Sequence, residues 1–229
     1  MTVDWISFVP AMLLLLFPAD RLLSSTVQLR RFDAFYTLEN SPRHRPWWWV
    51  PALWLDPLRG FAGTLLLGRA LEISPAEWAL APLEPYVLMV TLLGLGVICQ
   101  AVTWHEDVTV LLAPLGYVAG VVAALTTWPV ALFGLTIGLI GLFAFRQFHA
   151  FFSSACVAVF LLGFALGGDP MGFGPATGAL ALPVAAAIVC GRTLELPTRD
   201  ASGPSRKDRG RAPFLPTPAE QPPNQNRNP

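Results

Sequence analysis

Apolar residues dominate one long part of this chain, residues 85–191, which is almost free of charge. Its four formal charges are Glu106, Asp107, Arg146 and Asp169, and they fall at breaks in the apolar pattern. The breaks leave five apolar stretches, each about the length with which an α-helix crosses ~30 Å of hydrocarbon. We therefore predict an all-α fold, a polytopic integral membrane helix bundle. The five spans are expected at residues 85–104, 108–127, 129–145, 150–168 and 175–191.

Very short connections join these five spans, so consecutive helices should lie antiparallel and adjacent. Small residues recur at four-residue spacing, which lets helix backbones approach closely in lipid, and we interpret them as packing faces. The pairs are Gly116 with Gly120, Gly134 with Gly138, Gly163 with Gly167, and Gly174 with Gly178. Pro114 and Pro183 fall inside predicted spans and should kink them.

Two further apolar segments precede the five spans. Residues 5–18 form a run that is short for a span. Residues 57–72 follow Asp56 and Pro57, which resemble a helix start with aspartate as the N-cap. This second segment is predicted either to cross the membrane as a short span with snorkelling arginines or to lie flat as an amphipathic helix. The chain therefore has six to seven spans if these segments cross.

Basic residues decide between these alternatives. Seven of them follow residue 191, which places the C-terminus in the cytoplasm by the positive-inside rule. If residues 57–72 cross, the arginine-rich residues 21–45 lie on that same side and the acidic linker 72–84 on the other. We therefore favour seven spans in a plasma membrane, expected to be the bacterial inner membrane.

The chain divides into three predicted regions. Residues 1–84 are a membrane-associated region with one or two short helices, residues 85–191 are the five-span bundle, and residues 192–229 are a disordered, proline-rich basic tail. Tryptophan prefers the headgroup level, so four tryptophans are interpreted as interfacial anchors: Trp47, Trp48, Trp49 and Trp54. A basic cluster in the tail suits anionic lipid headgroups: Arg206, Lys207, Arg209 and Arg211.

Ionisable side chains that could carry chemistry gather at one rim of the predicted bundle. His105, Glu106, Asp107 and His149 share this rim with Arg146 and are weak candidates for a metal site. They occupy turns, where charge costs least, and no HExxH, GxSxG, Walker or GxGxxG pattern is present. We therefore expect no catalytic residue, no cofactor and no bound metal.

Composition narrows the function without naming it. Charged residues make up 13% of the chain and the formal net charge is zero, so a nucleic-acid partner is not expected. Asp56 and Arg59 could form a buried pair that marks a pathway, but we interpret them as a cap and an interfacial pair. We expect a non-enzymatic accessory or scaffold subunit whose partners are the lipid bilayer and other membrane proteins. A small transporter or channel is the alternative, and a membrane enzyme using the rim cluster is third.

Overall fold

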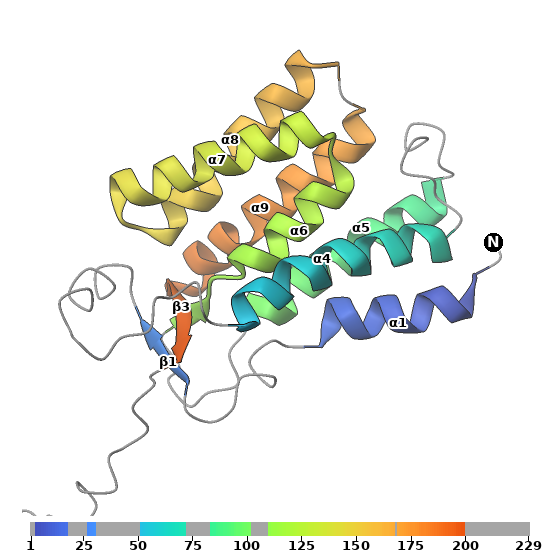
Figure 1. Cartoon of the computed structure of the whole chain (residues 1–229), viewed down its shortest axis with the longest axis horizontal. Coiled ribbons are helices and arrows are strands. Elements are labelled where there is room, and N and C mark those ends of the chain that lie inside the picture. The colour runs from blue at the N-terminus through green and yellow to red at the C-terminus, as the bar shows by residue number, and fades with distance from the viewer. Residues whose placement is uncertain are drawn as a thin grey trace, which may run out of the picture.

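The computed structural model describes residues 3–17, 27–30, 51–71, 83–101, 110–167 and 169–199. These residues are mostly helical, with three short strands (Figure 1). The helices are α1 (Trp5–Leu16), α4 (Pro51–Ala70), α5 (Leu83–Ala101), α6 (Leu115–Leu125), α7 (Trp128–Phe145), α8 (Phe148–Ala165) and α9 (Pro170–Cys190). The strands are β1 (Val27–Arg30), β2 (Val110–Leu112) and β3 (Thr193–Arg199).

Four helices are long and apolar enough to cross a membrane: α5, α7, α8 and α9, of 18 to 21 residues each. They confirm the helices predicted at 85–104, 129–145, 150–168 and 175–191, although α9 begins five residues earlier than expected. It begins there because Asp169 caps it, accepting a hydrogen bond from the Met171 amide at 3.0 Å, and Pro170 follows in the first turn.

The span predicted at residues 108–127 is wrong. This segment forms strand β2 and then helix α6, which has only 11 residues. Pro114 is the N-cap of α6 and does not kink a longer helix. Proline has no amide hydrogen and restricts the residue before it, so it favours a helix start over a helix interior.

Helix α1 occupies the apolar run expected at residues 5–18. Asp4 caps it, accepting hydrogen bonds from the Ile6 amide at 3.1 Å and the Ser7 hydroxyl at 2.7 Å. The Ser7 hydrogen bond holds the pKa of the Asp4 carboxyl below its usual value. At 12 residues α1 is about 18 Å long, which is well short of a membrane crossing.

Glycine faces bring several helices into direct contact. A Cβ at Gly138 would lie 2.8 Å from the Ala155 Cβ, so α7 and α8 pack backbone against backbone. A Cβ at Gly163 would meet the Phe173 ring of α9. The packing interpretation is confirmed for these faces and for Gly116 and Gly120, whereas nothing lies within 4 Å of a Cβ at Gly167, Gly174 or Gly178.

Consecutive helices alternate in direction (Figure 1). The Asp4 amide donates to the Ala70 carbonyl at 3.0 Å, which places the start of α1 beside the end of α4. The Tyr86 hydroxyl donates to the Met171 carbonyl at 3.0 Å, so α5 and α9 begin at the same end of the bundle. The up-and-down order expected from the short connections therefore extends to the N-terminal helices.

A three-stranded sheet lies at the end of the bundle where α9 finishes, and we call this the sheet end. β3 is the central strand, antiparallel to β1 and parallel to β2. The expectation that the disordered tail starts at residue 192 is wrong for Thr193–Arg199, because backbone pairing on both edges orders this segment. Pairing also places β1 beside the chain that leaves α9.

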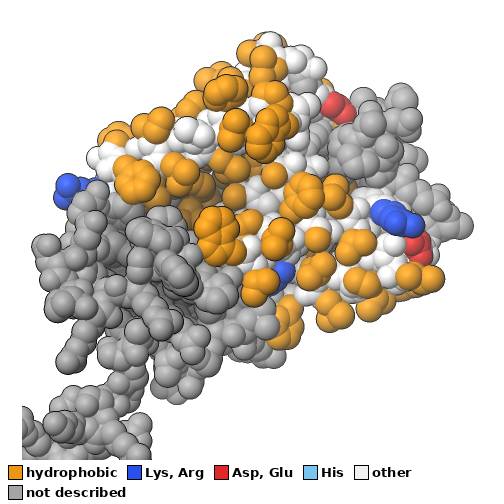
Figure 2. Space-filling model, viewed as in Figure 1, with side chains coloured by type: hydrophobic (Ala, Val, Ile, Leu, Met, Phe, Trp, Pro, Cys, Tyr) orange, Lys and Arg blue, Asp and Glu red, His pale blue; other side chains and the backbone are white. Residues whose placement is uncertain are grey.

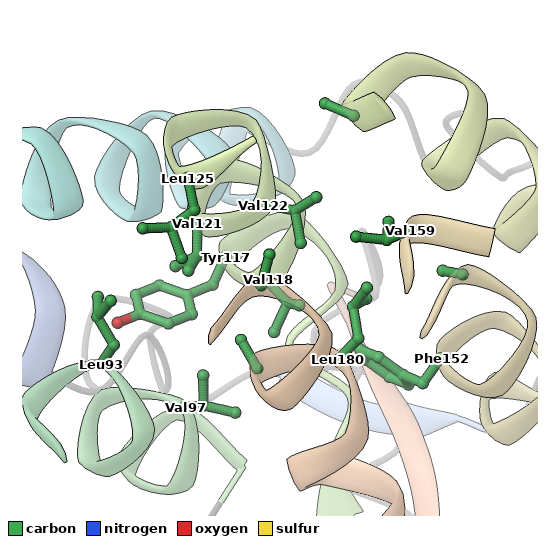
Figure 3. Close-up of a cluster of buried hydrophobic side chains, with 14 of the residues drawn as sticks. Leu93, Val97, Tyr117, Val118, Val121, Val122, Leu125, Phe152, Val159 and Leu180 are labelled. Carbon is green, nitrogen blue, oxygen red and sulfur yellow. The ribbon is translucent and has the colours of Figure 1, made fainter. Parts of the chain in front are cut away.

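The core lies where α5, α6, α8 and α9 meet. Figure 3 shows Val118 and Val122 of α6 together with Phe152 of α8 and Leu180 of α9, all fully buried. The outer surface is also apolar: hydrophobic side chains cover much of the described face in Figure 2. Their exposure is what a helix bundle surrounded by lipid requires.

Candidate functional site: a buried polar cluster around Arg59

Helix α4 carries two charged side chains into the bundle. Asp56 and Arg59 are three residues apart, so they lie on one helical face. Arg59 Nη1 donates to Asp56 Oδ1 at 3.2 Å, and Arg59 is only 8% exposed. The N-cap assignment of Asp56 is wrong because α4 begins at Pro51 and contains Pro57 in its interior. Asp56 and Arg59 are thus a largely buried ion pair.

Arg59 also binds the C-terminal end of α1. Its Nε and Nη2 atoms both donate to the Leu14 carbonyl at 3.3 Å, and Nη2 donates to the Phe17 carbonyl at 2.6 Å. The last four carbonyl groups of a helix have no partner within the helix and carry its partial negative charge. The guanidinium therefore satisfies hydrogen-bonding groups that the end of this short helix would otherwise leave unpaired.

Gln100 supplies a second set of donors to the same helix end. It is the penultimate residue of α5 and is 2% exposed. Its Nε2 donates to the Leu15 carbonyl at 3.2 Å and to the Phe17 carbonyl at 2.8 Å. Donors from α4 and α5 thus converge on three carbonyl groups at the end of α1, those of Leu14, Leu15 and Phe17.

Asp56, the acidic partner of Arg59, lies near the N-terminus of α6. Asp56 packs beside Gly116 in the first turn of α6, where a Cβ would be 3.2 Å from the Asp56 Cβ. A helix N-terminus carries partial positive charge and favours a nearby carboxylate. Two short helices therefore present their ends to the α4 ion pair with complementary sign, α1 to Arg59 and α6 to Asp56.

Tyr117 completes the cluster with an unused donor. Its ring reaches from α6 toward Leu93 of α5 (Figure 3). The residue is fully buried, and its hydroxyl has no hydrogen-bond partner among the described residues. A buried polar group left unpaired costs about 1–3 kcal/mol. We define the Arg59 cluster as Asp56, Arg59, Gln100, Tyr117 and the carbonyl groups of Leu14, Leu15 and Phe17.

Several other polar side chains in the helices bond to their own helix. Thr64 donates to the Gly60 carbonyl at 2.7 Å, and Thr136 donates to the Leu132 carbonyl at 2.7 Å. A shallow open groove of about 480 Å³ lies on α7 and α8, with two hydroxyl-bearing residues among aliphatic ones. Its lining is Ile137, Ser153, Ser154, Val157, Ala158 and Leu161. The Arg59 cluster brings together polar groups of α1, α4 and α5.

The sites predicted from the sequence are only partly described. His105, Glu106 and Asp107 lie outside the described residues, and His149 is the second residue of α8, half-buried. Within the described ranges, no three His, Cys, Asp or Glu residues are placed to hold a metal ion. The metal candidacy of the rim cluster stays untested.

The predicted lipid contacts are described at one position. Trp54 lies in the first turns of α4 and is exposed, whereas Trp47, Trp48 and Trp49 fall outside the described residues. Trp5 and Trp128, the first residues of α1 and α7, are exposed as well. The basic cluster also lies outside the described part of the chain: Arg206, Lys207, Arg209 and Arg211.

Sequence reasoning missed two members of the Arg59 cluster. Gln100 had a usable signal, because an amide inside an apolar span usually bonds to a neighbouring helix. Tyr117 had no such signal in the sequence, because a tyrosine near a helix start does not by itself indicate a polar cluster. Comparison of the chain with protein-family models, curated proteins and solved structures finds no match.

Replacing Gln100 with leucine is expected to lower the free energy of unfolding by about 1–2 kcal/mol, because the Leu15 and Phe17 carbonyls each lose a donor in a buried setting. Denaturant titration of the purified protein in detergent micelles measures this change. Gln147→Leu, at an exposed position between α7 and α8, is the matched control and should stay within about 0.5 kcal/mol of wild type. Equal effects of the two changes would contradict a structural role for Gln100.

Proposed function

We propose that this chain is an integral membrane protein without enzymatic activity, acting as an accessory or scaffold subunit through contacts with lipid and other membrane proteins. The observation that carries the proposal is the set of hydrogen bonds made by Arg59. Its guanidinium donates to Asp56 and to the carbonyls of Leu14 and Phe17, so the buried charge links α4 to the end of α1.

Membrane embedding is supported by the four long apolar helices and by the exposed tryptophans at helix starts. In this proposal α1, α4 and α6 complete seven helices of alternating direction. In the described part of the chain, two helices lie between β1 and β2 and four between β2 and β3. An even number of alternating helices returns the chain to the same end of the bundle each time.

The two ends of the bundle differ in charge, which supports the proposed orientation. Among the described residues, the sheet end includes Arg30, Arg146, Arg192 and Arg199, against Glu195. The other end of the described bundle includes Asp4, Glu84 and Asp169, against Arg69. By the positive-inside rule we place the sheet end and the C-terminus in the cytoplasm of a bacterial cell.

Single cysteines at Gln147 and Glu84 test this orientation in a background without Cys99, Cys156 and Cys190. Both positions are exposed and lie at opposite ends of the bundle. A membrane-impermeant maleimide is expected to label Glu84→Cys in intact cells, and Gln147→Cys only after permeabilisation. The reverse pattern would invert the proposed orientation, and labelling of both from outside would contradict the alternating arrangement.

A photo-reactive amino acid at Gly178 tests the proposed role. Nothing lies within 4 Å of a Cβ there, so the probe faces the surroundings of α9 without disturbing the bundle. Irradiation of cells is expected to give one dominant adduct with a membrane protein, at a yield that the same probe at Ile140, exposed on α7, does not reach. Adducts with lipid alone at both positions would contradict a partner on this face.

The second candidate, a small transporter, is favoured by one observation. The Asp56–Arg59 pair is largely buried, and ionisable residues inside membrane proteins often mark ion or substrate pathways. Purified chain in proteoliposomes with a pH or sodium gradient distinguishes the two functions. Flux that exceeds protein-free vesicles and disappears in Arg59→Gln would establish transport and overturn the accessory role.

A further inference from the structure

Helix α1 is fixed at its start and has a weak point in its middle. The Asp4 amide donates to the Ala70 carbonyl at 3.0 Å, which ties the start of α1 to the end of α4. Pro10 lies inside α1. Because proline lacks an amide hydrogen and crowds the carbonyl of residue i−4, a helix bends most readily there. The C-terminal half of α1 can therefore change direction while its N-terminal half stays in place.

The hydrogen bonds that hold the C-terminal half are accepted by backbone atoms. Arg59 and Gln100 donate to the carbonyls of Leu14, Leu15 and Phe17. Carbonyl oxygens recur at every residue with a rise of about 1.5 Å along the helix. The same donors can thus serve a slightly shifted helix end without loss of pairing.

Tyr117 offers a donor for such a shifted position. Its buried hydroxyl has no partner among the described residues. A Cβ at Gly96 would contact this hydroxyl and would lie 3.2 Å from the Leu15 carbonyl oxygen, so both oxygens flank the same point of α5. The Leu15 oxygen accepts from Gln100, and a carbonyl oxygen has two lone pairs.

We propose that the C-terminal half of α1 has two docked positions. In the position described here the Arg59 and Gln100 donors hold the helix end and the Tyr117 hydroxyl is unpaired. In the second, α1 bends at Pro10 toward α5 and the Leu15 carbonyl accepts a hydrogen bond from Tyr117. The hydrogen bond gained by the buried hydroxyl offsets the free-energy cost of the bend.

Distances between two spin labels measure the equilibrium. The labels are attached to Leu13→Cys in the C-terminal half of α1 and Val189→Cys at the end of α9, both exposed, with the native cysteines replaced by serine. The full chain is reconstituted in lipid nanodiscs. We expect two distances, with the second position holding on the order of a tenth of the molecules. Tyr117→Phe should reduce that population about tenfold.

Two further variants make the test specific. Tyr86→Phe is the matched control, because its hydroxyl already bonds to the Met171 carbonyl at the opposite end, and it should leave both populations unchanged. Pro10→Ala restores an amide donor at an exposed position and should also reduce the second population, independently of any effect of Tyr117 on folding. A single distance in the parent protein, or a second population that survives in both Tyr117→Phe and Pro10→Ala, would overturn the proposal.

Discussion

Replacing Arg59 with alanine is expected to lower the free energy of unfolding by about 3–5 kcal/mol, the cost of leaving one charge of a buried pair without its partner. The change leaves the Asp56 carboxylate without its charged partner, and it also removes the donors to the Leu14 and Phe17 carbonyls. Denaturant titration in detergent micelles, followed by tryptophan fluorescence, measures the loss. Arg59→Lys should recover only part of it, because an ammonium group cannot reproduce the forked geometry of a guanidinium.

Arg69→Ala is the matched control for this prediction. Arg69 is the same residue type in the last turn of the same helix, but it is exposed. Its replacement should cost less than about 0.5 kcal/mol. The double change Asp56→Asn with Arg59→Gln should cost less than Arg59→Ala alone, because no charge is left buried. Equal losses for Arg59→Ala and Arg69→Ala would contradict the buried position of Arg59.

The second large effect is expected at the crossing of α4 and α6. A Cβ added at Gly120 would overlap the Pro57 carbonyl oxygen and lie 2.7 Å from the Phe61 amide nitrogen. Both are backbone atoms, so the overlap can be relieved only by separating the helices. Gly120→Val should therefore cost about 3 kcal/mol or more and lower the yield of folded protein. Monodispersity on size exclusion and the denaturation midpoint measure these effects.

Gly178→Val in α9 is the control for Gly120→Val. Both variants replace a glycine in a helix interior with valine, but at Gly178 no atom of the described residues lies within 4 Å of the added Cβ. Its free energy of unfolding should stay within about 1 kcal/mol of wild type, the range of helix propensity. If Gly178→Val were as damaging as Gly120→Val, the loss would reflect the helix propensity of valine and not the α4–α6 contact.

The long helices could be predicted from the sequence because each is a continuous apolar segment of similar length. A segment of about 20 apolar residues must be helical, and α5, α7, α8 and α9 obey this with boundaries close to those expected. Segment 108–127 satisfied the same rule by composition, yet Pro114 and the pairing of β2 with β3 divide it. Apolar composition alone does not reveal such a division.

The candidate site was harder to predict because it depends on where helix ends meet. Asp56 and Arg59 were visible as a spaced pair, but Asp56-Pro57 also resembles a helix start, and that local signal was misleading. The partners of Arg59 are carbonyl groups of α1, about 45 residues earlier in the chain. Every residue carries a carbonyl, so the sequence holds no mark of which ones are left unpaired.

The sheet has a consequence for how the chain is made. Its central strand, β3, is the last described element to be synthesised, whereas its partner β1 lies about 170 residues earlier. Neither β1 nor β2 has its partner until α9 and β3 have been synthesised. Closure of such distant pairs is slow compared with local helix formation. Synthesis that stops before residue 193 therefore leaves β1 and β2 without the strand that pairs with both of them.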